Sequence, residues 1–330
     1  MPLKQVLDIL ELLDRPDATG SAVARLFAER GLAGMEVKAA RSRRGSTSFV
    51  KLTIPGTRGK AIGGKAPTLG IIGFLGGVGA RPEVIGLVSD ADGAVASLAA
   101  GLKLVDMYRV GDRLDGDVIL CTHISPNSPI ISHEPVPFMS SPVSMTTMKR
   151  HMVDERMDAV LSLDTTKGNR IINTRGFAIS PTVKEGYILR VSEDLLTVQQ
   201  NVTGRVPSVF AITTQDVTPY GNRLFHLNSI MQPASATVAP VVGIAITTEA
   251  VVPGCASGAS HEGDIELATR FVVEVAKGFG RKSVRFYDAA EFGRLVKLYG
   301  SMKHLQTLGN QEVGSGSAVR RRTRVRRDDE

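Results

Sequence analysis

The feature that most constrains this chain is the alternation of short apolar runs with segments of helical periodicity. Strand-like apolar runs stand at 35–40, 48–54, 69–75, 83–89, 117–122, 158–164, 209–213 and 241–248. Apolar residues recur at helical spacing in 4–14, 20–31, 93–108, 193–202, 263–278 and 289–301. Strands that alternate with helices are typical of layered α/β domains, in which the strands are buried on both faces. The pattern therefore predicts an α/β fold with a largely parallel or mixed sheet.

No internal repeat or interdomain linker interrupts the alternation, so we expect a single domain over residues 1–311. The chain then reads VGSGSAV at 313–319, which is linker-like, and continues into a run rich in arginine. Six arginines and three acidic residues give this end a net charge of +3, nearly half of the chain's +7. We predict that residues 312–330 are a disordered basic tail. A second basic run, with Arg41, Arg43 and Arg44, has no interleaved aromatic residues to stack on bases, so nucleic acid is not the partner we favour. The alternative is that the arginine tail binds nucleic-acid phosphates without reading the sequence.

No stretch approaches the roughly 18 to 20 uninterrupted apolar residues that a membrane-spanning helix needs. The N-terminal MPLKQVLDILELLDRP alternates apolar with charged residues and lacks the core of a signal peptide. We therefore expect a cytoplasmic protein without a membrane partner. Two cysteines, Cys121 and Cys255, are too few for a disulfide framework or a cysteine-only zinc site. A metal would have to be bound by His, Asp and Glu.

Metal-competent side chains follow or end several of the predicted strands. Ligands of open α/β sheets collect outside the carboxyl ends of the strands, so these residues are candidates for one site. In chain order they are Asp90, His123, Asp164 and His261. Carboxylates and imidazoles bind divalent ions such as zinc. The sequence thus predicts a site for one or two divalent ions; the alternative is that each residue has a structural role.

Three segments resemble the co-catalytic zinc exopeptidases, which are aminopeptidases and carboxypeptidases. These are SDADGAVASLAAGLKL, MDAVLSLDTT and PVVGIAITTEAVVPGCASGASHEGDIELATRFVVEVAKG. The resemblance implies that Asp90 is the metal-bridging carboxylate, with Asp92 as a second choice. It implies that Asp164 and His261 are metal ligands, that the metal is zinc, and that the fold is a zinc-exopeptidase-like three-layer α/β/α sandwich with a mixed, mostly parallel sheet.

The chain departs from these enzymes at two places. They carry a histidine before the bridging acid, whereas here no histidine precedes His123. Their paired glutamates are also missing, and Thr122 and His123 stand in that place. The changed set is compatible with one metal, with a different reaction, or with no catalysis.

Most of residues 5–280 resemble an uncharacterised bacterial and archaeal family, the domain of unknown function 1177. The resemblance is carried by THISPNSP, HEPVPFM, LDTTKGNR, GFAISPTVKEGYILRVSEDLL and TTQDVTPYGN. It implies no particular activity.

Further candidates follow from their chemistry. Glu134 or Glu262 is expected to move the proton of a metal-bound water; the alternative is a loop carboxylate in solvent. Four polar residues in the loops after predicted strands are expected to contact the substrate: Lys167, Asp216, Asn222 and Arg223.

Our leading hypothesis is a metal-dependent hydrolase that acts on a C–N bond of a short peptide, amide or cyclic amide. The alternative is a non-catalytic small-molecule-binding or assembly protein on a degenerate zinc-exopeptidase fold. The helix at 93–104 has few charges, which predicts burial on all sides, either within the chain or at a contact between copies. A homo-oligomer is therefore among the expected partners.

Overall fold

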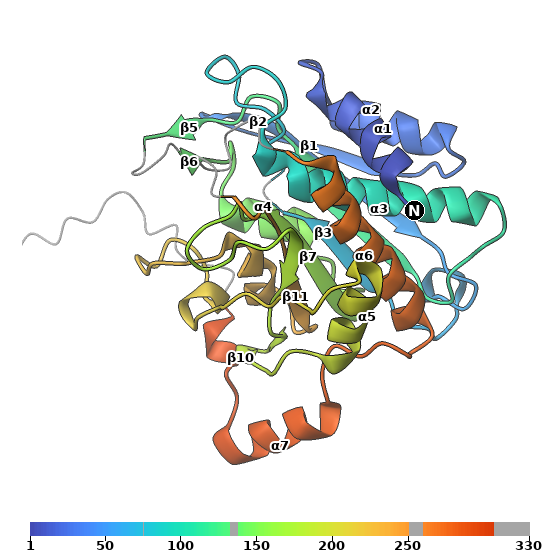
Figure 1. Cartoon of the computed structure of the whole chain (residues 1–330), viewed down its shortest axis with the longest axis vertical. Coiled ribbons are helices and arrows are strands. Elements are labelled where there is room, and N and C mark those ends of the chain that lie inside the picture. The colour runs from blue at the N-terminus through green and yellow to red at the C-terminus, as the bar shows by residue number, and fades with distance from the viewer. Residues whose placement is uncertain (75, 133–137, 251–259, 307–330) are drawn as a thin grey trace, which may run out of the picture.

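The computed structural model describes residues 1–74, 76–132, 138–250 and 260–306 (Figure 1). Its helices are α1 (Leu3–Asp14), α2 (Gly20–Glu29), α3 (Asp92–Arg109), α4 (Met145–Met152), α5 (Glu193–Thr203), α6 (Glu262–Gly280) and α7 (Ala289–Tyr299). Its strands are β1 (Glu36–Ser42), β2 (Gly45–Ile54), β3 (Leu69–Gly73), β4 (Val118–Ile124), β5 (Ile130–Ile131), β6 (Phe138–Met139), β7 (Ala159–Thr165), β8 (Gly176–Ile179), β9 (Val183–Lys184), β10 (Tyr187–Ile188) and β11 (Val241–Thr247). Short 3-10 turns include η2 (Ser89–Ala91), η3 (Gln215–Val217) and η4 (Ser229–Ser235).

One large mixed sheet organises the described chain. Its strands lie in the order β1-β2-β4-β3-β7-β11-β9-β10, and β8 pairs with β11. The four central strands β4, β3, β7 and β11 are parallel, while β2 runs antiparallel to β4 and β8 antiparallel to β11. The predicted α/β class and mixed sheet are therefore confirmed. Because the central strands are parallel, their carboxyl ends meet at one edge of the sheet.

The central strands are buried on both faces, which explains why they read as continuous apolar runs. Successive side chains of a strand point to opposite faces. Leu120 accordingly packs in the cluster under the helices, whereas its neighbour Cys121 packs in the cluster on the other face. Burial raises the pKa of the Cys121 thiol to about 12, so this cysteine is an inert core residue.

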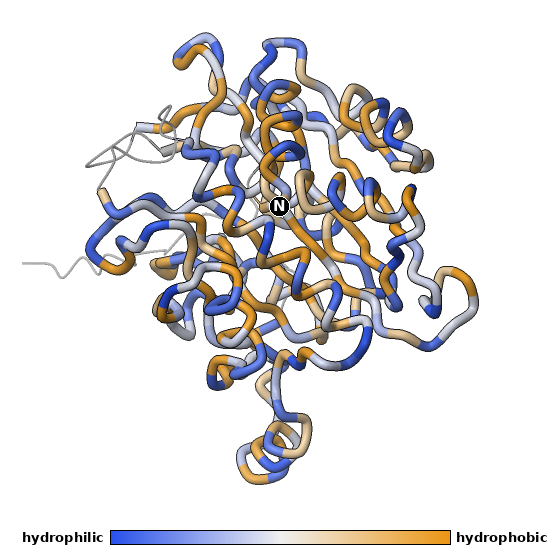
Figure 2. The backbone as a smooth tube through the Cα atoms, turned by 45° about the vertical axis from the view of Figure 1, so that its right-hand side comes forward, coloured by the Kyte–Doolittle hydropathy of each residue, from blue (hydrophilic) through white to orange (hydrophobic). Residues whose placement is uncertain are grey.

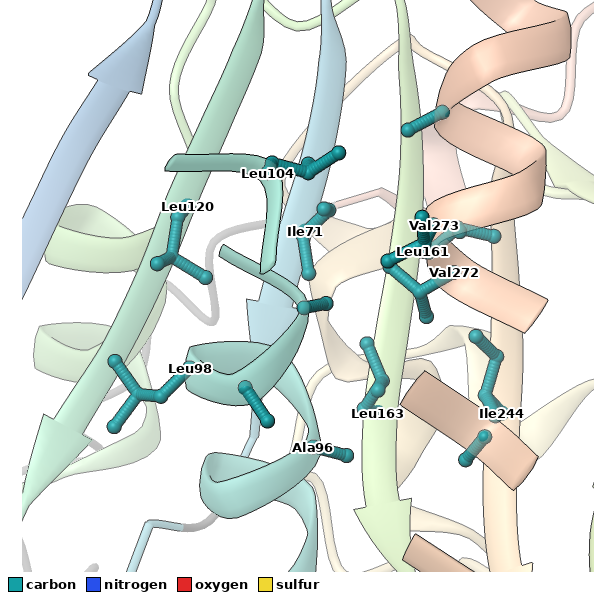
Figure 3. Close-up of a cluster of buried hydrophobic side chains, with 14 of the residues drawn as sticks. Ile71, Ala96, Leu98, Leu104, Leu120, Leu161, Leu163, Ile244, Val272 and Val273 are labelled. Carbon is teal, nitrogen blue, oxygen red and sulfur yellow. The ribbon is translucent and has the colours of Figure 1, made fainter. Parts of the chain in front are cut away.

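Helices α3 and α6 cover one face of the sheet (Figure 1). Figure 3 shows side chains of α3, such as Leu98, and of α6, such as Val272, directed at strand residues that include Leu161 and Leu163. Every residue of α3 from 92 to 102 is buried, so the expectation of burial on all sides is confirmed. Figure 2 shows the same chain coloured by hydropathy, with hydrophobic residues along much of the backbone in the interior of the molecule. Helix α4 and η4 contact the other face.

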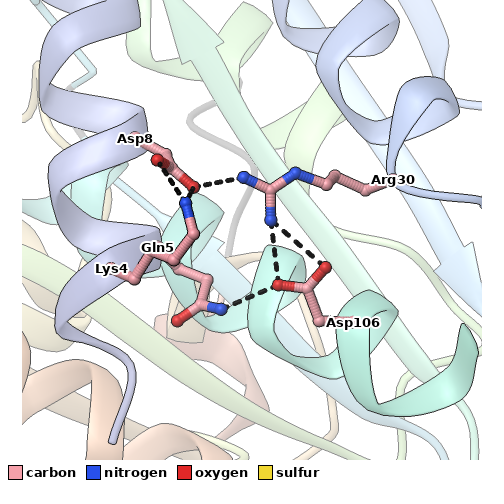
Figure 4. Close-up of polar contacts among 5 residues, drawn as sticks. All are labelled: Lys4, Gln5, Asp8, Arg30 and Asp106. Carbon is pink, nitrogen blue, oxygen red and sulfur yellow. Dashed lines mark hydrogen bonds and ion pairs between the residues drawn. The ribbon is translucent and has the colours of Figure 1, made fainter. Parts of the chain in front are cut away.

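The N-terminal helices are fixed on α3 by a polar cluster as well as by apolar packing. Arg30, just after α2, forms ion pairs with Asp8 of α1 and with Asp106 of α3 (Figure 4). Gln5 Nε2 donates to Asp106 Oδ2 at 2.7 Å, and Lys4 pairs with Asp8. One guanidinium thus connects three helices.

Two predicted strands are not strands. The segment 83–89 is a loop that contains Gly86 at φ +90, a left-handed conformation that a ladder does not accommodate. The segment 209–213 makes only an isolated bridge between Val209 and Ile179. The edge of β11 that it would need is already paired with β8 and β9. The structure also contains elements that the sequence pattern does not predict, because their sequence signals are weak: helix α4 and the short strands β5, β6, β8, β9 and β10.

The other helices and strands occur where the pattern predicts them, within a few residues. In the described ranges, no helix has the length and apolar character needed to cross a bilayer. The predicted tail at 312–330 lies outside the described residues.

Gly93 sets how closely α3 approaches the end of β7. A Cβ at this position would lie 2.7 Å from the Leu163 carbonyl oxygen and 3.0 Å from the Asp164 Cα. Gly93→Ala is therefore expected to lower the free energy of unfolding by about 1 to 3 kcal/mol, because backbone must move. Gly293 in α7 has open space around it, so Gly293→Ala should be neutral or gain up to about 1 kcal/mol. Urea unfolding of both variants checks this, and equal stability of the two would contradict it.

Candidate functional site

Three segments that are distant in sequence meet at the carboxyl edge of the sheet. Thr165 Oγ1, at the end of β7, donates to the Ser89 carbonyl oxygen of η2 at 2.6 Å. Lys167 Nζ, just beyond β7, lies 2.5 Å from Asp92 Oδ2 at the start of α3. Ser260 Oγ, just before α6, donates to Asp92 Oδ1 at 2.5 Å. Asp92 therefore joins the entry to α3, the loop after β7 and the entry to α6.

The Asp92–Lys167 ion pair is almost completely excluded from solvent. The Asp92 side chain is 0% exposed and the Lys167 side chain 3%. Burial raises the pKa of Asp92, while Lys167 and the Ser260 hydroxyl act in the opposite direction by stabilising the carboxylate. Both carboxylate oxygens are occupied by donors from the chain itself. The positive charge at this point of the site is supplied by Lys167.

Asp164, at the carboxyl end of β7, has no cationic partner among the described contacts. It is 2% exposed, and its oxygens accept from the Thr165 backbone N–H at 2.7 Å and from Ser229 Oγ at 2.9 Å. Burial raises the pKa of Asp164 to about 7, and the two hydrogen bonds only partly oppose this. The partly buried Tyr220 lies near Ser229, and burial raises the pKa of its hydroxyl. A carboxyl group that titrates near neutrality is suited to both accept and release a proton.

His123 is buried, and its two ring nitrogens connect β4 to β2 and to the segment after β3. It lies within β4 and not after the strand's end, since β4 continues to Ile124. Its Nε2 accepts from the Gly76 backbone N–H at 2.9 Å, so the network assigns the proton to Nδ1, which lies 2.9 Å from Thr47 Oγ1. Burial lowers the pKa of His123 to about 4, which keeps the ring neutral. Both ring nitrogens are engaged, so neither is free to bind a metal.

Two other predicted ligands, Asp90 and His261, follow Ser89 and Ser260 directly in the chain and so lie on segments of this arrangement. Asp90 is buried on η2, after a loop and not after a strand. His261 and Glu262 are exposed at the N-terminal end of α6, where the His261 carbonyl accepts from the Asp264 N–H. Glu134 falls in 133–137, outside the described residues.

The predicted substrate residues divide into two groups. Asp216 is buried and accepts from Thr213 and from the Asn228 N–H, which fixes the loop that leads to η4. Asn222 and Arg223 are exposed on this loop, and Arg223 adopts a positive φ of 64. Lys167, in contrast, belongs to the buried ion pair. Of the four predicted substrate residues, Asn222 and Arg223 alone are exposed.

The donor set of the described residues does not fit a metal centre. No three or more His, Cys, Asp and Glu side chains of the described chain are grouped so that they could hold an ion. Asp92 has Lys167 and Ser260 on its oxygens, and both nitrogens of His123 are bonded. Zinc dependence therefore stays a prediction from the resemblance.

Sequence reasoning missed the residues that surround Asp164 and Asp92. Ser229, Tyr220 and Ser260 carry hydroxyls, and serine and tyrosine at loop positions give no signal of their own. Asp164 itself could be found from its position at a strand end. Its partners could not, because they come from loops 56 or more residues further along the chain.

Removing one member of the buried ion pair should destabilise the protein strongly. Lys167→Met leaves the Asp92 carboxylate buried without its cation, which costs about 3 to 5 kcal/mol. Adding Asp92→Asn to this variant removes the unpaired charge and should recover much of the loss. Lys60→Met, which breaks the exposed Lys60–Asp158 pair, should cost about 1 kcal/mol or less. Urea unfolding measures all three, and a Lys167→Met variant as stable as the parent would contradict the assignment.

The Asp164 carboxyl should impose a pH dependence on stability. Its pKa is about 7 in the folded chain and about 4 in the unfolded chain, so the folded state retains a proton that the unfolded state has lost between these values. The stabilisation is complete below about pH 4 and is lost as the pH rises to about 7, by up to ~1.4 kcal/mol per pH unit. Urea unfolding between pH 4 and 8 should show this slope in the parent chain and not in Asp164→Asn. Parallel curves for the two proteins would refute it.

Comparison with known proteins gives one family match. A family model described as "Protein of unknown function (DUF1177)" matches residues 38–309, which include the whole sheet except its first two residues and all the site residues described above. None of the curated proteins matches the chain.

Proposed function

The chain belongs to the DUF1177 family of proteins of unknown function, and from the geometry of its site we propose that it is an acid–base hydrolase. The proposed substrate is a small peptide, amide or cyclic amide, cleaved at a C–N bond. The observation that carries the proposal is the buried Asp164 carboxyl at the carboxyl end of β7, with its pKa raised to about 7. Perturbed carboxyl groups at this edge of an α/β sheet are characteristic of catalytic sites.

In the proposed reaction, Asp164 acts first as a general base. Its carboxylate accepts a proton from water while the water oxygen attacks the carbonyl carbon of the substrate. It then returns the proton to the substrate nitrogen as the C–N bond breaks, which releases a carboxylic acid and an amine. Ser229 Oγ donates to Oδ2 of Asp164 and holds the carboxyl group in one orientation.

The preference for a C–N bond rests on the resemblance to zinc exopeptidases, and we extend the proposal to their layered fold. In its support, the three resembling segments form the entry to α3, strand β7, and β11 with α6. The described parts of these segments adjoin one another around Asp92 and the end of β7. The zinc that the resemblance implies has no part in the proposed proton transfer.

A second candidate function is that of a non-catalytic small-molecule-binding protein. It is favoured by the engagement of Asp92, His123 and Asp216, whose polar atoms are bonded to other groups of the chain. Polar groups that are held by hydrogen bonds within the fold are not free to transfer a proton. A site made of such groups would bind a ligand without reacting with it.

The experiment that tests the enzyme proposal is an assay of amine release from dipeptides, N-acyl amino acids, primary amides and cyclic imides. The parent chain should hydrolyse at least one class, with kcat/KM rising with pH until about 7 as the Asp164 carboxylate forms. Asp164→Asn should lower kcat/KM by about 10² to 10⁴-fold while its circular dichroism spectrum stays unchanged. Asp158→Asn, at the opposite edge of the sheet, is the matched control and should remain active.

The assay is run on protein as purified, after chelation with EDTA, and after addition of zinc or manganese. Activity that survives chelation supports proton transfer by Asp164 alone, whereas activity that needs the ion supports the zinc prediction instead. No turnover of any class under the three conditions, or full activity of Asp164→Asn, would overturn the proposal.

A further inference from the structure

A hollow of about 920 Å³ opens at the amino edge of the sheet, opposite to the site described above. It lies where β7 and β11 begin, next to Asp158 and Pro240. The end of α4, the turn at 153–158 and the segment 236–240 form its walls, together with Lys184 and Tyr287. A volume of this size accommodates a small organic molecule.

Lys149 of α4 is the unusual group in this hollow. The residue is 1% exposed, and its Nζ donates to Ser235 Oγ at 2.8 Å. Ser235 Oγ donates its own hydrogen bond to the Gln232 carbonyl oxygen at 2.8 Å, so it offers the ammonium a neutral hydroxyl oxygen and no negative charge. In the described part of the chain no carboxylate forms an ion pair with Lys149, although an ammonium has three hydrogens to donate.

A buried ammonium without an anionic partner is costly, and this cost lowers its pKa. Burial lowers the pKa of Lys149 to about 8, with no opposing contribution from a neighbouring acid. Buried lysines are normally paired. Lys149 thus lacks the negative charge that would balance it.

Two of the three acids that line the hollow are engaged elsewhere. Asp154 is held by Lys51 at 2.9 Å and by Arg156 at 2.8 Å, and Asp158 is held by Lys60 at 2.6 Å. Of the basic side chains, Lys184 is paired with Glu185 outside the lining. Arg150 adds a further positive charge to the wall beside Lys149, and Glu155 is the remaining acid.

We propose that this hollow binds a small organic acid whose carboxylate pairs with Lys149. One carboxylate supplies the single negative charge that the buried ammonium lacks, and charge-assisted hydrogen bonds of this kind are stronger than the present bond to a hydroxyl. Apolar side chains in the walls, including Val153, Met157 and Val238, suit the organic part of the ligand. The inference is independent of the proposed hydrolase, because none of these residues belongs to the Asp164 site.

The test is isothermal titration calorimetry and thermal unfolding with matched pairs of probes, butyrate against butyramide and benzoate against benzamide. The full chain should bind at least one carboxylate and raise its melting temperature with it, and should bind the amide at least ten-fold more weakly. Lys149→Met should abolish the difference between acid and amide. This variant removes an unpaired buried charge, so it is expected to fold. Lys60→Met, which alters a neighbouring exposed lysine, should bind like the parent.

A second readout separates charge from shape. Binding of the carboxylate should weaken as the pH rises through about 8, where Lys149 loses its proton, and Lys149→Arg, which stays charged, should move this loss to higher pH. Equal binding of acid and amide, unchanged binding by Lys149→Met, no binding of any carboxylate at millimolar concentration, or tighter binding of inorganic phosphate would overturn the proposal.

Discussion

The burial of carboxyl groups at the ends of the parallel strands is the constraint on which this site depends. Removing a carboxylate from water is unfavourable unless it is paired, hydrogen bonded or protonated. Three buried aspartates of this chain each rely on a different one of these arrangements. Asp92 is paired with Lys167, Asp216 is bonded by backbone and hydroxyl donors, and Asp164 has its pKa raised to about 7. Each solution also joins segments that the sheet alone would not hold together.

The two edges of the sheet differ in how their buried charges are matched. At the carboxyl edge, Asp92 and Asp216 are held by donors from the chain, and Asp164 is the carboxyl group to which we assign the proton transfer. At the amino edge, Lys149 has the Ser235 hydroxyl as its partner within the described residues, and the missing negative charge points to a ligand. The apolar strands between the edges make both situations costly, since water is excluded from the ladder on both faces.

Much of the fold could be predicted from the sequence because its central strands are long, apolar and buried on both sides, and its major helices are strongly periodic. The failures have physical causes. The segment 83–89 has an apolar run, but Gly86 adopts a positive φ of 90 that interrupts an extended strand. His123 has the chemistry of a metal ligand, but a backbone donor from Gly76 and the Thr47 hydroxyl occupy its ring. Asp164 was predictable from its strand end, whereas Ser229 and Ser260 were not, because only tertiary packing brings them to the carboxylates.

The central claim is that Asp164 is a carboxyl group that titrates near neutrality because it is buried without a cation. The direct measurement is a carbon-13 NMR titration of aspartate-labelled protein, in which the Asp164 carboxyl resonance is assigned by its absence from Asp164→Asn. We predict that this resonance shifts with a midpoint near pH 7 while exposed aspartates titrate near their usual value of about 4. A midpoint near 4 for Asp164 would contradict the account, because the carboxyl group would then lack the proton that the proposed chemistry requires.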